Sequence, residues 1–417
     1  MTTTTPSVRR PARIPLGLLL LMGTLAAIGP FSIDMYLPAL PDIGRALVAT
    51  PDRVQATLAA YFAGLAAGQL VLGPLADRYG RKPPLIGGLV LYVIASLGCA
   101  VAPTIEALLV MRFFQAFGAC AGMVASRAVL RDLFDPRDMA RALSLVMLVM
   151  GIAPIIAPMV GSGVGTLFGW PAIFVTLAIY GALTLGATGL GLQETLPSDT
   201  RRPLQIGRIL RTYGGLFGQR QFMTYAIAGG VAQAGMFAYI ASSSFVFIEV
   251  FDLGQLAFSL VFGGNALGLI FASQVNERLL RTRSPRAVLP VVFGVYVLAT
   301  AVLLASAITG IGGLVGIIVP LFVSVSCLGF CFPNTTAAAM APVGDRAGSA
   351  AALLGTLQYG IAGLSSFLSG LFFAESAVSM AAMMFGCAAL ASLALATTLI
   401  PGLAPDTDAE PESVPAT

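Results

Sequence analysis

The sequence predicts an all-α membrane protein with twelve transmembrane helices arranged as two six-helix halves. Of its 417 residues, 57% are hydrophobic and only 10% are charged, whereas about 25% are charged in a typical soluble domain. Twelve segments are long and apolar enough to cross a bilayer, which takes about 20 residues each. In addition, residues 62–81 recur as residues 262–281, so we expect two related halves.

The predicted spans follow one another with short loops, except in the middle of the chain. Thr50-Pro51 and Asp135-Pro136 predict two helix starts, because in each a capping side chain precedes a proline suited to the first helical position. The first six spans are predicted at 14–40, 53–75, 84–103, 105–130, 138–165 and 170–191, and the last six at 221–249, 255–275, 286–308, 312–338, 346–372 and 376–400.

The segments outside the spans predict two tails and one linker. Residues 1–13 are expected to be a cytoplasmic tail before the first half at 14–191. Residues 192–220 hold five arginines and are predicted to be a cytoplasmic linker to the second half at 221–400. The acidic, proline-rich residues 401–417 predict a disordered cytoplasmic tail.

The distribution of basic residues predicts the orientation in the membrane. One side holds 20 of the 23 lysines and arginines, the other side holds only Arg45 and Arg53, and Arg112 falls inside a span. Cytoplasmic loops are enriched in basic residues, so both termini are predicted to be cytoplasmic. Arg9 and Arg10 then precede a first transmembrane helix rather than a cleaved signal peptide.

The composition excludes several kinds of site. The absence of histidine removes His-containing zinc sites, Ser–His dyads and histidine proton relays. The single lysine, Lys82, is followed by Pro83, so the chain has no Walker A loop. All five cysteines lie in apolar stretches and are expected to be buried. No cofactor, metal ion or nucleic acid is expected. The expected partners of a monomeric chain are a small-molecule substrate, protons and the lipid bilayer.

Asp34 in the first span and Arg112 in the fourth are charged residues placed deep in the membrane. A charge there costs a few kcal/mol and marks a functional site by default. Each lies about seven residues from the outer end of its span, or roughly 10 Å, so the two side chains are expected to meet. Without histidine, Asp34 is the group that can exchange a proton, and Arg112 can bias that exchange. A static ion pair that orients two helices is the alternative.

Residues 73–82 predict a short cytoplasmic loop whose glycines allow a tight turn and whose charges contact neighbouring helix ends. Topology alone would need only its positive charges, which is the simpler alternative. The residues predicted to control the conformational change are Gly73, Asp77, Arg78, Gly80 and Arg81.

The repeat favours a role for this loop beyond topology. Asp77 aligns with Glu277, and Arg81 aligns with Arg281. Two halves with the same orientation are typical of transporters built from parallel repeats. The second copy is degraded, because Leu280 stands where the first copy has a glycine.

The fifth span contains Pro154 and Pro158, which remove backbone donors and bend the helix. We interpret it as a flexible packing element between the halves, with a merely kinked structural helix as the alternative. Polar, aromatic and methionine side chains within spans are candidates to line a substrate cavity, although each such residue is more often a packing residue. They are Tyr61, Gln115, Met147, Gln233, Met236, Tyr239, Asn265, Asn334, Gln358 and Tyr359.

Several motifs together resemble the major facilitator superfamily, and within it the bicyclomycin-resistance and chloramphenicol-efflux branch of the drug:proton antiporters. The resemblance spans roughly residues 14–400 and implies the major facilitator fold. The motifs are Ser32-Ile-Asp34-Met-Tyr-Leu-Pro38-Ala-Leu-Pro41, the segment 73–82, Met111-Arg112-Phe-Phe-Gln115, Ala153-Pro-Ile-Ile-Ala-Pro158, Glu194-Thr-Leu-Pro197 and Ala234-Gly-Met236-Phe.

The resemblance implies roles for individual residues. Asp34 matches the proton-coupling carboxylate, and Arg112 matches an arginine tied to coupling. The charged residues of segment 73–82 match a set that holds the closing interface together, with Asp132 as an expected partner. The fifth-span motif departs from the family pattern at Ala157 and Ser162, so this motif by itself does not argue for antiport.

The predicted function is a proton-coupled multidrug efflux transporter of the bacterial inner membrane. It would export small amphipathic compounds, such as bicyclomycin- or chloramphenicol-like antibiotics, by alternating access. The alternatives are an exporter of a physiological metabolite such as an amino acid, and a proton symporter. An enzyme would show clustered catalytic groups near one membrane face, and a channel would show repeated polar rings. The sequence shows neither pattern.

Overall fold

The computed structural model describes residues 16–201, 205–373 and 376–397. In this part of the chain the regular structure is entirely helical, and twelve helical segments are long and apolar enough to cross a membrane. The twelve predicted spans are therefore confirmed. The predicted boundaries of the two halves and of the linker stay predictions, and both predicted tails lie outside the described residues.

The first six spans come from α1 to α7. The fourth and fifth are long, so their inner turns extend beyond the predicted ends. The elements are α1 (Leu16–Asp34), the 3-10 turn η1 (Leu37–Ala39), α2 (Leu40–Ala46), α3 (Pro51–Tyr79), α4 (Lys82–Ala100), α5 (Ile105–Leu133), α6 (Pro136–Phe168) and α7 (Trp170–Gly191).

The last six spans come from α9 to α14, after a short amphipathic helix, α8. The elements are the 3-10 turn η2 (Ser198–Thr200), α8 (Ile206–Phe217), α9 (Arg220–Ser244), the π-helical turn η3 (Phe245–Val250), α10 (Gln255–Leu279), α11 (Pro285–Thr309), α12 (Gly313–Met340), η4 (Gly344–Arg346), α13 (Ala347–Phe373) and α14 (Ala377–Ala396).

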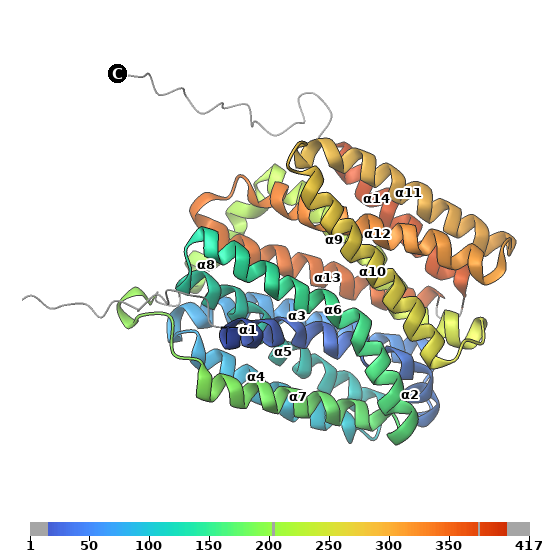
Figure 1. Cartoon of the computed structure of the whole chain (residues 1–417), viewed down its shortest axis with the longest axis horizontal. Helices are drawn as coiled ribbons and strands as arrows, with labels where there is room; N and C mark the ends of the chain where they lie inside the picture. Colours follow the sequence, from blue (N-terminus) through green and yellow to red (C-terminus); the bar gives the residue numbers. More distant parts are fainter. Residues whose placement is uncertain (1–15, 202–204, 374–375, 398–417) are drawn as a thin grey trace, which may run out of the picture.

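Two pairs of helices join the halves, α3 with α13 and α6 with α10. Figure 1 shows α13 lying between α3 and α9. We call the end that holds α8 the inner end and the end that holds α2 the outer end, following the predicted orientation. Small residues allow the halves to approach closely, because a Cβ on Gly355 would meet Gln69 at 3.1 Å and a Cβ on Gly370 would meet the backbone of Asp52 at 3.1 Å.

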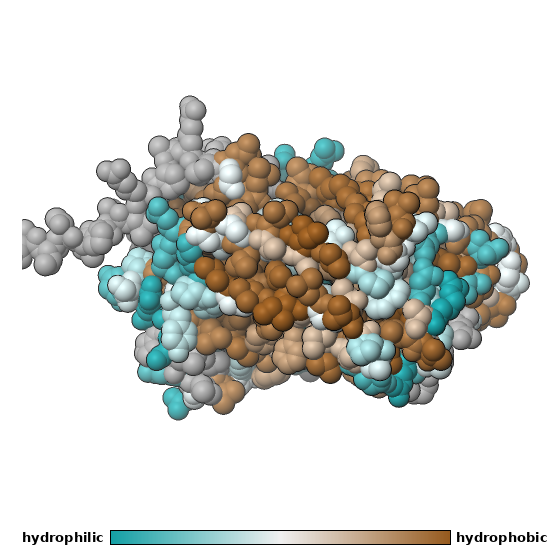
Figure 2. All heavy atoms as spheres, turned by 90° about the horizontal axis from the view of Figure 1, so that it is seen from below, coloured by the Kyte–Doolittle hydropathy of each residue, from teal (hydrophilic) through white to brown (hydrophobic). Residues whose placement is uncertain are grey.

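The surface has the pattern of a membrane protein. Figure 2 shows hydrophobic side chains covering the middle of the molecule and hydrophilic ones gathered toward both ends. Large apolar side chains in the middle are exposed, including Ile94 (61%), Phe271 (72%) and Leu298 (64%). In water such a surface would be an interaction or aggregation site, and in a bilayer it contacts the lipid chains.

The structure corrects the first predicted span, which is not one continuous helix. α1 ends at Asp34, and the chain passes through η1 before α2 begins at Leu40. Pro38 explains the break, because a proline ring clashes with the carbonyl four residues earlier and supplies no N–H to it. That carbonyl belongs to Asp34. The predicted proton carrier therefore lies at a helix end.

Local predictions near the inner end also need correction. Segment 73–82 is mostly helical, because α3 continues to Tyr79 and only Gly80 and Arg81 connect it to α4. A Cβ on Gly73 would meet nothing within 4 Å, so this glycine is not required by a turn.

Of the two predicted helix caps, one is formed. Thr50 precedes α3 but makes no side-chain cap, whereas the carboxylate of Asp135 accepts from the N–H of Asp138 at 3.0 Å.

Candidate functional site

Arg112 is fully buried between aromatic rings in the first half. Its guanidinium carbon lies 4.2 Å from the ring centroids of both Tyr36 and Tyr61, and 5.8 Å from that of Phe174. Desolvated cation–π contacts are worth about 2 kcal/mol each. These rings therefore offset part of the cost of burying the charge.

Hydrogen bonds hold the same guanidinium in place. Nη1 of Arg112 donates to the carbonyl of Ser32 at 2.9 Å and to Oε1 of Gln115 at 2.7 Å. Gln115 in turn donates to the hydroxyl of Ser96 at 2.8 Å. Nε and Nη2 of Arg112 have no hydrogen-bond partner. The arginine is thus positioned by α1 and α5 but keeps donors available for an acceptor that this conformation does not supply.

The expected contact between Asp34 and Arg112 is not formed. Among the described residues, the carboxylate of Asp34 has neither an ion pair nor a hydrogen bond, although the residue is only 4% exposed. It lies within electrostatic range of Tyr239 on α9 in the other half. Arg112 instead donates to the carbonyl of Ser32, two residues before Asp34.

The break is pressed against α6. A Cβ on Gly161 would lie 1.7 Å from the carbonyl oxygen of Met35, so only glycine fits there. The same helix contains Pro154 and Pro158, and the carbonyl of Pro158 accepts from the hydroxyl of Ser259 on α10 at 3.1 Å. α6 therefore touches both the Asp34 segment and the other half. The gating role of the two prolines stays a prediction.

The residues predicted to line a cavity fall into three groups. Tyr61 and Gln115 belong to the buried surroundings of Arg112. The hydroxyl of Tyr239 accepts from Asn265 at 3.0 Å, and Asn334 donates to Asn276 at 2.8 Å, so these three are buried and bonded within the second half. The side chains with exposed area are Met147, Gln233, Met236, Gln358 and Tyr359. Their contact with substrate stays a prediction.

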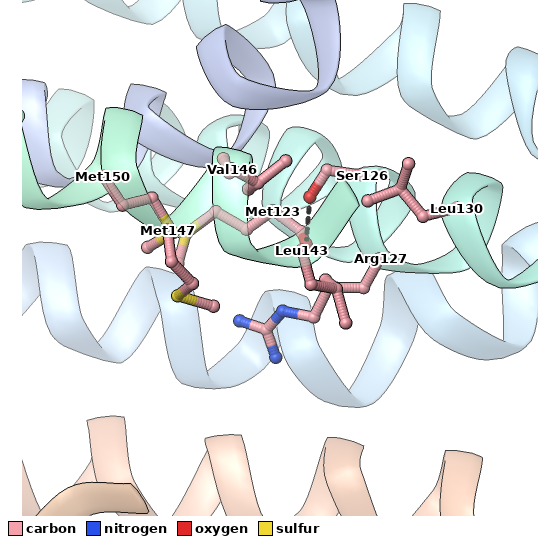
Figure 3. Close-up of a pocket in the computed structure, with 9 residues that line it drawn as sticks. Met123, Ser126, Arg127, Leu130, Leu143, Val146, Met147 and Met150 are labelled. Carbon is pink, nitrogen blue, oxygen red and sulfur yellow. Dashed lines mark hydrogen bonds between the residues drawn. The ribbon is translucent and has the colours of Figure 1, made fainter. Parts of the chain in front are cut away.

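A shallow pocket opens between α1, α5 and α6, on the inner side of the Arg112 region (Figure 3). Methionines form much of its wall, and Met147 is 52% exposed. Arg127 lines the pocket as well, and Figure 3 shows its guanidinium extending away from the backbone of α5. The sequence assigned Arg127 to the cytoplasmic side, and the structure places it in the inner part of α5, six residues before the helix ends at Leu133.

The segment between α3 and α4 is tied to the end of α5 by charge. Arg81 donates to Asp77 at 2.6 Å and to Asp132 at 2.7 Å, and its side chain is only 5% exposed. The structure thus brings together three of the residues predicted to control the conformational change. Arg78 lies apart from them, over the ring of Tyr79 at 5.2 Å.

Glu194 completes this cluster and was not predicted as a site residue. Its carboxylate accepts from the backbone N–H of Arg81 at 2.8 Å and of Lys82 at 3.2 Å, where α4 begins. Anions are stabilised at helix N-termini. A Cβ on Gly80, which has φ +96°, would lie 2.3 Å from the Glu194 carboxylate. This contact requires a glycine at position 80. The sequence signal was Glu194-Thr-Leu-Pro197, which contributed only to the family resemblance.

Burial raises the pKa of Glu194, but hydrogen bonds from four backbone N–H groups lower it by more. They belong to Leu196, Arg81, Lys82 and Thr195, and together they hold the pKa of this carboxyl below its ordinary value. The ionised form is therefore the one that the folded protein stabilises.

The second copy of the motif lacks these partners. Arg281 and Glu277 are 3.7 Å apart, and their side chains are 74% and 68% exposed. An exposed pair of this kind contributes little to stability. Leu280 has φ −68° and directly continues the end of α10, so the left-handed turn of Gly80 is absent at this position.

Polar contacts join the halves at the outer end. Arg45 on α2 donates to Glu249 at 3.3 Å, and Gln255 on α10 donates to Asp42 at 2.8 Å. Arg45 also pairs with Asp42 at 2.5 Å. α2 is therefore linked to η3 and α10, which closes the outer end of the molecule.

Comparison with known proteins places these features in a family. A sequence model of the Major Facilitator Superfamily matches residues 22–367. The chain is 38% identical to "Uncharacterized MFS-type transporter YdgK" of Bacillus subtilis, over 91% of this chain and 94% of the relative. It is 29% identical to "Bicyclomycin resistance protein homolog" of Haemophilus influenzae, over 90% and 94%.

The fold is also similar to that of a solved transporter. The structure of a D-xylose-proton symporter superposes with a TM-score of 0.72 over 90% of this chain and 96% of that one, at 12% identity. At this identity the similarity establishes the fold alone.

Proposed function

The chain belongs to the Major Facilitator Superfamily, and we propose that it is a proton-coupled exporter of small amphipathic compounds. It is a multi-pass membrane transporter, and we place it in the bacterial inner membrane with both termini in the cytoplasm. The relative named for bicyclomycin resistance supports antibiotics of that kind as cargo. Exposed methionine in the pocket wall supports a site that adapts to different apolar bodies.

The observation that supports proton coupling is the separation of Asp34 from Arg112. An ionised carboxylate buried without a partner costs several kcal/mol, so this conformation suits a protonated Asp34. Arg112 nearby keeps unpaired donors in its aromatic surroundings. A second arrangement of the helix break would bring the ionised carboxylate to those donors.

These two arrangements define a transport cycle. Substrate entering from the cytoplasm favours release of the Asp34 proton on that side, and the carboxylate then pairs with Arg112. After the halves have rocked and the outer end has opened, a proton from outside returns to Asp34 and breaks the pair. The substrate then leaves, and the contacts of Asp42 and Arg45 with η3 and α10 re-form.

Asp34→Asn tests this proposal, because it removes the proton exchange and keeps the size of the side chain. We expect the variant to lose export driven by a pH gradient in proteoliposomes while it still binds substrate. Its substrate affinity should be nearly constant between about pH 5 and 8, where that of the wild type should change. Asp34→Glu should retain partial activity, since the carboxyl group survives in a displaced position.

The matched control is Asp199→Asn, the same change at an exposed position of the linker. It should export like the wild type. Normal gradient-driven export by a well-expressed Asp34→Asn protein would remove Asp34 from the mechanism.

A further inference from the structure

Arg127 is an exposed cation in the inner part of α5. It lies about 9 Å inside the inner end of α5, at 1.5 Å per residue. Its side chain is exposed, and among the described residues it makes neither an ion pair nor a hydrogen bond. The planar guanidinium suits carboxylate, sulfonate and phosphate groups. Arg127 therefore has donors available for an incoming anion.

The guanidinium of Arg127 lies on the side of α5 that faces the second half. Arg127 is within electrostatic range of Tyr359 on α13, which belongs to the second half. In α5 it also shares a helix face with Cys120, which packs against Gly68 of α3. The guanidinium thus lies near the α3–α13 junction, on the route by which a substrate from the cytoplasm would enter.

The surroundings of Arg127 combine this charge with an adaptable apolar wall. Met123, Met147 and Met150 line the pocket beside it, and Figure 3 shows their side chains between α5 and α6. The enclosed volume is only about 10 Å³, which is close to the space of one water molecule. The pocket can therefore hold only a small apolar part of a ligand. The remainder of the ligand would lie outside the pocket, beside Arg127.

We propose that Arg127 and this methionine pocket form an entry subsite for amphipathic anions. A carboxylate, sulfonate or phosphate group binds the guanidinium, and the apolar body of the compound rests on the methionines. Arg112 cannot take this role, because it is sealed from solvent by its aromatic rings. The inference rests on the proposed export function and narrows its substrates to neutral and anionic compounds. Permanent cations are repelled at entry.

A matched pair of fluorescent probes tests the subsite. 8-Anilinonaphthalene-1-sulfonate is an anion, and N-phenyl-1-naphthylamine is its neutral counterpart without the sulfonate. Binding is measured by fluorescence titration of the purified protein in phosphatidylcholine nanodiscs. Arg127→Gln removes a charge-assisted hydrogen bond to the sulfonate, which solvent partly screens. Arg127→Gln should therefore bind the sulfonate about five- to tenfold more weakly and the neutral probe within twofold of wild type.

Three further variants separate charge from packing. Arg127→Lys keeps the charge and should bind the sulfonate within about threefold of wild type. Met147→Ala should weaken both probes alike, because it removes apolar contact. Arg283→Gln makes the same charge change in an exposed loop between α10 and α11 and should change neither affinity. Equal losses of both probes in Arg127→Gln, or no loss of the sulfonate, would overturn the proposal.

A lipid headgroup presents the same anionic chemistry, so one arm uses nanodiscs that contain phosphatidylglycerol. A substrate subsite should keep its preference for the sulfonate there, whereas loss of that preference would assign Arg127 to lipid and overturn the substrate role. Transport is scored separately. If the probes bind as expected but neither is exported under a pH gradient, the export function fails and the anion subsite stands.

Discussion

A single buried residue shows how the protein keeps a charge inside the membrane without a counter-ion. Arg112 has hydrogen bonds at one nitrogen only, and the ring faces of Tyr36 and Tyr61 cover the rest of its guanidinium. The planar guanidinium suits this stacking, which a lysine ammonium would not reproduce. The stacking thus offsets part of the desolvation of Arg112, although two of its donor nitrogens have no hydrogen-bond partner. Those donors are what a coupled carboxylate would use.

Glu194 allows a prediction about pH at the level of one carboxylate. Because its folded-state pKa is lowered, its stabilising effect is complete above the ordinary value near 4.5 and is lost as pH falls through the folded value. Glu194→Gln should lower the thermal unfolding midpoint at pH 7 by about 1–2 °C, the size of a helix N-terminal anion worth about 1 kcal/mol in a chain of this length. The measurement is a thermal unfolding series of both proteins in detergent from pH 7 to 3.5.

The difference between the two proteins should begin to shrink below about pH 4.5, where the carboxyl group of the unfolded chain takes up a proton, and it should shrink further as pH falls toward the lowered folded-state pKa. Glu277→Gln serves as the control, because its side chain is 68% exposed and its partner Arg281 is 3.7 Å away. A difference that stays constant across the whole pH range would show that the Glu194 charge does not stabilise α4.

At the scale of elements, the two copies of one motif have diverged in structure. In the first copy, the short connection between α3 and α4 is held by Asp77, Asp132 and Glu194. In the second copy, the connection between α10 and α11 is longer and its charges are exposed. The same sequence pattern therefore builds a rigid corner in one half and a solvated turn in the other.

This divergence predicts unequal effects of equivalent mutations. Asp77→Asn and Arg81→Ala should each slow transport several-fold and leave equilibrium substrate binding largely intact, because interactions that bias two conformations are worth about 1–3 kcal/mol. Glu277→Gln and Arg281→Ala should have milder effects, since their side chains make no buried contact. Initial transport rates and equilibrium binding of the four variants, normalised to expression, test this. Equally severe defects in both copies would contradict the asymmetry.

At the scale of the whole molecule, the halves are joined by α3 with α13, by α6 with α10, and by the polar contacts of α2 at the outer end. Near the inner end of α3, Gly73 has open space around it. The pocket at Arg127 is lined by residues Met123 to Leu130, toward the inner end of α5. Polar side chains of α2 thus link the two halves at the outer end.

The orientation of the whole chain is tested by cysteine labelling. Single cysteines at Thr50 and Asp252 should react with an impermeant maleimide added to intact cells, because both positions are exposed at the outer end. A cysteine at Arg208 should react only after permeabilisation, because the basic linker is predicted to be cytoplasmic. The unmodified protein is the control, since all five native cysteines are buried. Labelling of position 208 in intact cells would reverse the orientation and the proposed direction of transport.

The sequence alone was enough to predict the twelve spans, the repeat and the charged residues that are costly to place in a membrane, because each of these depends on local composition. The tertiary structure decided how those residues are used. The depths of Asp34 and Arg112 predicted a contact, but depth does not fix the direction of a side chain, and the contact is not formed. The Glu194 contact with α4 and the unpaired Arg127 depend on which distant helices become neighbours. The packing of helices that are far apart in the sequence decides which side chains meet. The spacing of residues along the chain does not predict this.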